Sequence, residues 1–246
     1  MRQIVKRSLL NMIPDRVKRL VMDDILKGQN ITRDNIHFSQ EGEDIILDKI
    51  YIDQKDGFYV DVGAHHPSKL SNTYKYYLRG WNGINIDAMP GSMEAFLKVR
   101  PKDINLELGV SETEGELPFY VFEQPTLNTF DEKTAKEHER TRGVTIKKVV
   151  KVKTFPLNRI LDQYLKDGQQ IDFLSIDVEG FDYQVLLTNN WEKYTPKVIL
   201  VESIGASIED ILQSEIYKYL TSKGYLFISK TFHTNIFQHR NYVKSY

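Results

Sequence analysis

From residue 38 onward, short apolar runs alternate with stretches in which apolar residues recur at helical spacing. Apolar runs bounded by Gly, Pro or polar residues predict buried strands, and a spacing of three to four residues predicts amphipathic helices. The predicted strands span residues 57–62, 83–87, 104–110, 117–122, 171–177, 197–202, 225–229 and 234–238. The predicted helices span residues 43–51, 72–79, 93–99, 156–164, 183–188 and 208–222.

This alternation is typical of βαβ units, so the pattern predicts an α/β fold. We expect a mostly parallel sheet of roughly seven strands with helices on both of its faces. The connection between the last two strands is too short for a crossover helix, and this pair should therefore be antiparallel.

Two segments stand apart from this pattern. Residues 1–30 are basic and apolar with a break at Pro14. They predict a helical arm that packs on the single domain expected over 31–246 or on a second subunit. The alternative is a basic amphipathic helix that contacts a membrane surface. Residues 124–153 are crowded with charge and show no periodicity. They predict a lid or binding loop, with a solvated surface excursion as the alternative.

Composition and charge exclude several classes of functional site and of partner. The chain of 246 residues has no cysteine, and its 33 basic and 34 acidic residues leave a net charge of −1. Thiolate metal sites and cysteine nucleophiles are therefore excluded, and nucleic acid is not expected as a partner. No segment reaches the roughly 18 consecutive apolar residues of a membrane span, and the first residues lack the apolar core of a secretory signal. We expect a cytoplasmic protein, with peripheral membrane contact as the alternative.

The first strand ends in a turn with a single glycine, Asp61-Val62-Gly63-Ala64-His65-His66. A dinucleotide fingerprint needs further glycines, so the turn disfavours NAD or FAD and suits a nucleoside without phosphates. The second strand ends on Asp87, where a carboxylate can accept hydrogen bonds from ribose hydroxyls or cap the next helix.

Acidic residues also gather where the later strands end. Asp177, Glu179 and Asp182 follow one strand, and Glu202 ends the next. Such clusters are costly to bury without a compensating charge. They predict a site that holds a ligand amine, binds a metal or supplies a base. The alternative is that they cap the next helix.

Three segments together resemble the FkbM family of S-adenosylmethionine-dependent methyltransferases. They are Phe38-Ser39-Gln40-Glu41-Gly42-Glu43-Asp44, Asp61-Val62-Gly63-Ala64 and Ile176-Asp177-Val178-Glu179-Gly180. The resemblance spans residues 38–203. It implies the Rossmann-like class I methyltransferase fold, a seven-stranded sheet whose last strand is antiparallel, and S-adenosylmethionine as cofactor.

The resemblance also assigns residues to the cofactor. Asp61, Gly63 and Ala64 would lie along its methionine part, Asp177 would face the methionine end, and Gln40 would close over the site. Asp87, followed by Ala88, would bind the ribose, and Gly109, Val110 and Ser111 would flank the adenine. Asn72 and Thr73 would donate hydrogen bonds. Many family members carry Asn where this chain has His65.

Methyl transfer to a hydroxyl requires alignment of the acceptor, the methyl group and the sulfur, together with removal of one proton. We favour Glu179 as the base beside Asp177, with His65 second; His66, Glu202 and His233 are further candidates. A divalent ion held by Asp177, Glu179 or Glu202 is an alternative that no ligand spacing favours.

The family resemblance favours O-methylation of a sugar, carried on a nucleotide or in a cell-surface polysaccharide. Basic residues of 141–153 would meet a diphosphate, and the rings of Tyr74, Tyr76, Tyr77 and Trp81 would stack on the sugar. The alternative for both sets is that they are ordinary surface and core residues. The competing hypotheses are a nucleotide-dependent oxidoreductase on the same kind of sheet and a non-catalytic membrane-associated binding module.

Overall fold

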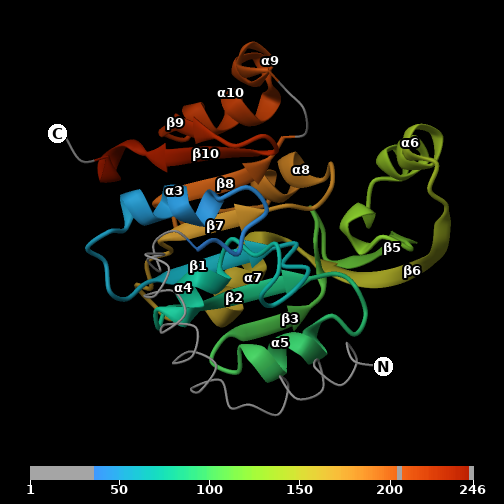
Figure 1. Ribbon diagram of the computed structural model, residues 1–246, viewed down its shortest axis with the longest axis horizontal. Helices are drawn as coiled ribbons and strands as arrows, with labels where there is room; N and C mark the ends of the chain where they lie inside the picture. The colour runs from blue at the N-terminus through green and yellow to red at the C-terminus, as the bar shows by residue number, and fades with distance from the viewer. Residues whose placement is uncertain (1–35, 204–206, 244–246) are drawn as a thin grey trace, which may run out of the picture.

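The computed structural model describes residues 36–203 and 207–243. At its centre lies a seven-stranded sheet in the order β3-β2-β1-β7-β8-β10-β9 (Figure 1). Neighbouring strands from β3 to β8 are parallel, whereas β10 runs antiparallel to both β8 and β9. The strands are β1 (Phe58–Val62), β2 (Asn82–Asp87), β3 (Ile104–Glu107), β7 (Phe173–Ile176), β8 (Val198–Glu202), β9 (Tyr225–Lys230) and β10 (Thr234–His239). The predicted α/β fold with an antiparallel last strand is confirmed.

Helices cover both faces of this sheet, which explains why all five residues of β1 are buried. On one face Val60 packs in a cluster with Leu157 and Leu220 from helices. On the other face Tyr59 packs in a cluster with Leu47 and Tyr76. The helices are α3 (Glu43–Ile50), α4 (Tyr74–Leu78), α5 (Met93–Val99), α7 (Leu157–Tyr164), α8 (Asp182–Leu187), α9 (Ile208–Gln213) and α10 (Glu215–Ser222).

A second sheet of three strands, in the order β4-β6-β5, stands beside the main sheet (Figure 1). It consists of β4 (Gly109–Val110), β5 (Gly115–Phe122) and β6 (Ile146–Phe155). A short 3-10 turn, η2 (Pro125–Leu127), and helix α6 (Glu132–Arg142) connect β5 to β6. The prediction of a charged loop over 124–153 is therefore wrong, because most of that segment folds into α6 and β6.

Two further predictions need correction. The strand expected over 104–110 breaks at Leu108, so that β3 pairs with β2 whereas β4 pairs with β6. The helix expected over 208–222 breaks at Ser214, whose backbone is extended (ψ 154°) and whose side chain accepts a hydrogen bond from the Tyr217 amide at the start of α10. The arm predicted over 1–30 lies outside the described residues. Within the described residues, no helix is long and apolar enough to cross a membrane.

Candidate active site

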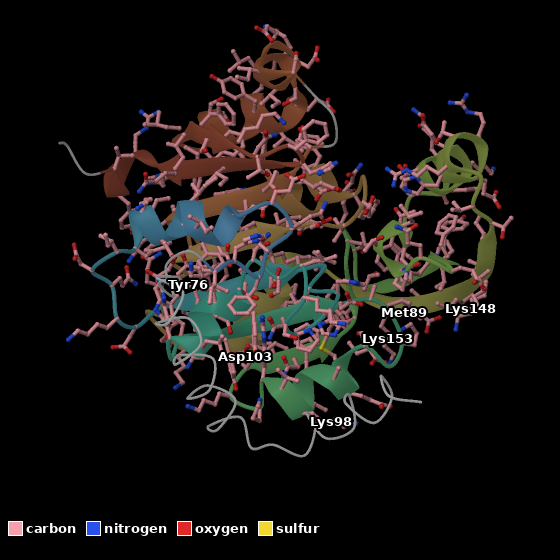
Figure 2. All side chains as sticks on the ribbon, viewed as in Figure 1. Tyr76, Met89, Lys98, Asp103, Lys148 and Lys153 are labelled. Carbon is pink, nitrogen blue, oxygen red and sulfur yellow. The ribbon has the colours of Figure 1, made fainter. Side chains whose placement is uncertain are left out.

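A cavity of about 700 Å³ lies beyond the carboxyl ends of β1, β2, β7 and β8. The second sheet forms its opposite wall, and Met89 lies between the end of β2 and this sheet, where it packs against Phe119 and Val152 (Figure 2). Of the residues predicted to bind the cofactor or carry the chemistry, those that line the cavity are Gln40, Gly63, His65, Asp87, Ala88, Gly109, Val110, Asp177, Glu179, Glu202 and His233. Their individual roles stay predictions.

The glycine turn after β1 requires a residue without a side chain. Gly63 has a φ of +85°, and a Cβ at this position would lie 1.8 Å from the backbone oxygen of Asp177. The Gly63 and Ala64 amides both donate to the Ile86 carbonyl, at 2.9 and 3.0 Å. The turn is thus held between the ends of β2 and β7, and its backbone faces the cavity.

Asp87, at the end of β2, organises the adjoining wall. Its Oδ2 accepts a hydrogen bond from the His65 amide and its Oδ1 accepts one from the Met89 amide, each at 2.8 Å. Burial raises the pKa of Asp87, and these two donors oppose that rise. Each carboxylate oxygen has a further lone pair, so Asp87 can still accept a hydrogen bond from a ligand hydroxyl.

Five predicted cofactor residues do not line the cavity: Asp61, Ala64, Asn72, Thr73 and Ser111. Asp61 and Thr73 lie behind the glycine turn in a buried network, where the Thr73 hydroxyl donates to Asp61 Oδ2 at 2.8 Å and accepts from Arg100 Nη1 at 2.8 Å. Burial raises the pKa of Asp61, although the Arg100 charge and the Thr73 hydrogen bond oppose it. In this structure Asp61 and Thr73 are therefore held in buried hydrogen bonds rather than exposed to the cavity.

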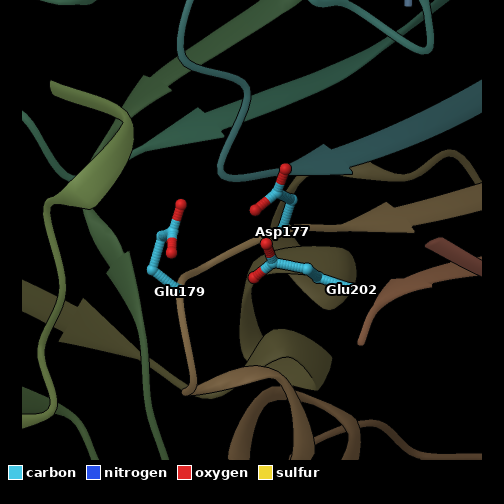
Figure 3. Close-up of side chains that lie close together, drawn as sticks. All are labelled: Asp177, Glu179 and Glu202. Atoms are coloured by element: carbon cyan, nitrogen blue, oxygen red, sulfur yellow. The ribbon is translucent and has the colours of Figure 1, made fainter. Parts of the chain in front are cut away.

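The carboxylates predicted at the strand ends do come together. Oxygens of Asp177, Glu179 and Glu202 lie within 4.8 Å of one another (Figure 3). Desolvation by the surrounding protein, followed by the Asp61 and Glu43 charges, raises the pKa of Asp177 to about 6, although its side chain opens onto the cavity. Desolvation and then the Asp177 charge raise the pKa of Glu179 to about 8 and that of Glu202 further still.

Asp182 has a different position from the other acidic residues of its segment. Its carboxylate accepts hydrogen bonds from the Val178 and Gly180 amides, at 3.3 and 3.2 Å. Both donors precede α8, which has no side-chain cap, so Asp182 does not cap that helix but holds the turn that presents Glu179.

The segment 38–44 closes one rim of the cavity through Gln40. The Glu41 carboxylate accepts from the His233 amide at 2.8 Å and also contacts His233 Nδ1. Glu43 Oε1 accepts from the hydroxyls of Thr231 and Thr234, each at 3.0 Å. These contacts tie the segment to the β9–β10 turn.

Several other candidates lie elsewhere. Tyr76 and Trp81 are 0% and 1% exposed in the core, so they are not available to stack on a sugar. His66 uses Nδ1 to accept from the Ser68 and Lys69 amides and does not line the cavity. The basic side chains of 141–153 do not line it either, apart from Arg142; Lys148 and Lys153 lie on the exposed part of β6 (Figure 2).

Sequence reasoning missed His138, which comes from α6. Its side chain is 6% exposed, and its Nε2 lies 3.9 Å from Glu179 Oε2. Neither atom has a hydrogen-bond partner. No sequence pattern placed His138 near the site, because residues 124–153 were expected to form a loop.

A doubly covered parallel sheet with one antiparallel last strand, and an acidic cavity at the carboxyl ends of its strands, define an α/β enzyme that binds its ligand at those ends. The methyltransferase FkbM domain matches residues 61–227, well over half of the chain. The protein therefore belongs to the FkbM family of methyltransferases, and the predicted resemblance is confirmed.

No curated protein matches the sequence closely enough to count as a relative. Among solved structures, one from Pyrococcus horikoshii described as a "putative RNA methyltransferase" is similar at 10% sequence identity and a TM-score of 0.42. The similarity covers 80% of this chain and 83% of that chain.

Proposed function

We propose that this protein is an S-adenosylmethionine-dependent O-methyltransferase whose acceptor is a hydroxyl of a sugar, carried on a nucleotide or in a polysaccharide. The observation that carries the proposal is the cluster of Asp177, Glu179 and Glu202 beside the Gly63 turn, in one cavity with Asp87. The family as a whole supports methyl transfer from this cofactor.

The cavity fits the cofactor in size and in chemistry. About 700 Å³ lies within the range of ligand pockets. S-Adenosylmethionine carries a sulfonium and an ammonium, and both charges are complementary to the carboxylates at the ends of β7 and β8. Asp87 can accept hydrogen bonds from ribose hydroxyls, and the apolar side chains of Ile86, Met89 and Val110 offer a surface for the purine.

When bound, the cofactor supplies an electrophilic methyl group on a positively charged sulfur. The residues of this chain must hold the acceptor hydroxyl in line with that methyl group and remove its proton. Glu179 takes the proton, because the raised pKa of its carboxyl makes the carboxylate a stronger base than an ordinary glutamate. With the cofactor bound, the oxygen so positioned would form the new O–C bond to the methyl group, and the electron pair of the broken C–S bond would stay on sulfur.

Polar and aromatic residues that line the cavity support a sugar as the acceptor. The side chains of Gln124 and Thr126 line the cavity and, within the described part of the chain, form no side-chain hydrogen bonds. Phe130 and Phe181 line the same cavity with their ring centroids 6.1 Å apart. Free amide and hydroxyl groups next to aromatic rings suit a ring that carries several hydroxyls and an apolar face.

Calorimetry with S-adenosylmethionine tests the cofactor, and mass spectrometry of a nucleotide-sugar panel incubated with the protein tests the acceptor. We expect saturable binding of the cofactor and a gain of one methyl group on one member of the panel. A phenolic and an amine acceptor serve as matched controls. Binding of NAD(P) in place of S-adenosylmethionine would favour the oxidoreductase hypothesis, and methylation of the amine alone would contradict a hydroxyl acceptor.

A further inference from the structure

We infer that Asp177, Glu179 and Glu202 form a binding site for one hard divalent cation, which positions the acceptor hydroxyl. This inference rests on the proposed function for the identity of the acceptor, but not for the binding of the ion. The three side chains leave the ends of two adjacent strands, β7 and β8, and converge (Figure 3). Their ligand oxygens lie within 4.8 Å of one another, close enough to share one ion once small side-chain rotations bring them to bonding distance.

Protein groups do not balance this negative charge. Within the described residues, none of the carboxylate oxygens of Asp177, Glu179 or Glu202 accepts a hydrogen bond, and no Lys or Arg forms an ion pair with them. Arg142 lines the same cavity but stays exposed. Carboxylates held this close repel one another when ionised, and a cation bound among them would supply the positive charge that no ion pair with a described Lys or Arg provides.

His138 provides a second and independent observation. Its imidazole is 6% exposed and has no hydrogen-bond partner at Nε2, although this atom lies 3.9 Å from Glu179 Oε2, which also has no hydrogen-bond partner. That distance is about 1 Å longer than a hydrogen bond. If Glu179 binds an ion through one oxygen, His138 can donate to the other oxygen and fix the orientation of the carboxylate. Hydrogen bonds of this kind commonly hold metal ligands in place.

The ligand set indicates the class of ion. It consists of carboxylate oxygens, and the chain has no cysteine, which favours Mg²⁺, Mn²⁺ or Ca²⁺ over softer metals. Three carboxylates leave positions open for water and for one substrate oxygen. An ion there favours the ionised form of a bound hydroxyl and so assists its deprotonation.

The experiment measures Mn²⁺ binding to the full-length protein after treatment with EDTA, by electron paramagnetic resonance and without cofactor. We expect one Mn²⁺ per chain, displaced by excess Mg²⁺ or Ca²⁺. Binding should weaken at least about tenfold in Glu202→Gln and Asp177→Asn, because each loses a ligand. Glu209→Gln, an exposed change on α9, is the matched control and should bind as the wild type does. Circular dichroism verifies that each variant is folded.

His138 acts as a positioning residue and has its own test. His138→Leu should weaken Mn²⁺ binding about tenfold, whereas His138→Gln, which can still donate a hydrogen bond from a similar position, should recover most of it. An equal loss in both variants would contradict this role for His138.

Absence of Mn²⁺ binding, or wild-type binding in Glu202→Gln, would overturn the cation site. If S-adenosylmethionine binds and methyl transfer continues at full rate in EDTA, the cluster serves only the charge of the cofactor, and the cation inference fails while the proposed function stands. If Mn²⁺ binds at the cluster but S-adenosylmethionine does not bind, the proposed function fails and the cation site stands.

Discussion

The buried guanidinium of Arg100 is predicted to be a main determinant of stability behind the active site. Arg100 is 0% exposed, and four hydrogen bonds of 2.7–2.9 Å link it to the segment before α4 and to β2. An ion pair of 3.8 Å connects it to Asp103, which is also buried. The hydrogen-bond acceptors are the Pro67 carbonyl and the side chains of Ser71, Thr73 and Asn85.

The expected loss in the free energy of unfolding follows from the groups that lose a partner in Arg100→Met. Asp103 loses its charged partner, the charge that opposes the raised pKa of buried Asp61 disappears, and several acceptors lose a donor. Removing one partner of a buried ion pair costs about 3–5 kcal/mol. At about 2–4 °C per kcal/mol for a chain of this size, the melting temperature should fall by about 6–20 °C.

Urea unfolding followed by circular dichroism measures the free energy of unfolding directly. Arg100→Lys is the matched variant, because it keeps the charge near Asp103 but cannot donate in four directions at once. We expect its loss to be intermediate. A loss below about 1 kcal/mol in Arg100→Met, the range of an ordinary surface change, would show that the network does not stabilise the fold as argued.

Three further predictions concern the cavity. Gly63→Ala should abolish S-adenosylmethionine binding in calorimetry while the protein stays folded, because the new Cβ meets the Asp177 carbonyl at 1.8 Å and alanine is strained at a φ of +85°; unchanged affinity would exclude the turn from the cofactor site. Asp87→Ala should weaken the same binding by about 1–3 kcal/mol through lost hydrogen bonds to a charged group, and wild-type affinity would remove Asp87 from the ribose role. Glu202→Gln should raise the melting temperature of the protein without ligands by about 2–8 °C. Desolvation, followed by the neighbouring carboxylate charges, raises the pKa of Glu202, so folding must keep this carboxyl protonated at neutral pH, a cost of about 1–2 kcal/mol or more that the neutral amide does not carry; a lower melting temperature would contradict this cost.

The main sheet was predictable because its strands are short apolar runs buried on both faces. The second sheet was not, because β6 reads Ile-Lys-Lys-Val-Val-Lys-Val-Lys-Thr-Phe, with lysines at its exposed positions and Val149 52% exposed. Helix α6 buries only Ala135 and His138 and therefore has almost no apolar pattern. Elements that contribute so little to the core carry a weak hydrophobic signal.

The convergence of Asp177 with Glu202 was predictable from the rule that parallel strands end at one edge. The positions of Asn72 and Thr73 were not predictable, because the pattern of apolar and polar residues does not show which side chains of a turn face the cavity and which face the protein interior. The Asn72 amide donates to the Ser175 hydroxyl at 3.1 Å, and Thr73 is buried against Asp61. His138 reaches Glu179 only through the packing of α6, which local sequence does not specify.

The second sheet and α6 determine how Glu179 is presented to the cavity. Glu179 has a φ of +50°, a left-handed conformation that is strained for a non-glycine residue. Gly180 follows it with a φ of +88°. The Thr129 hydroxyl donates to the Glu179 carbonyl at 2.9 Å, and a Cβ on Gly180 would meet the Thr134 hydroxyl at 2.7 Å. Both threonines lie between β5 and β6 in the chain, so the inserted segment holds this turn in place. Changes in that segment can therefore alter the position of Glu179 and the shape of the acceptor site while the main sheet and its cofactor wall stay the same.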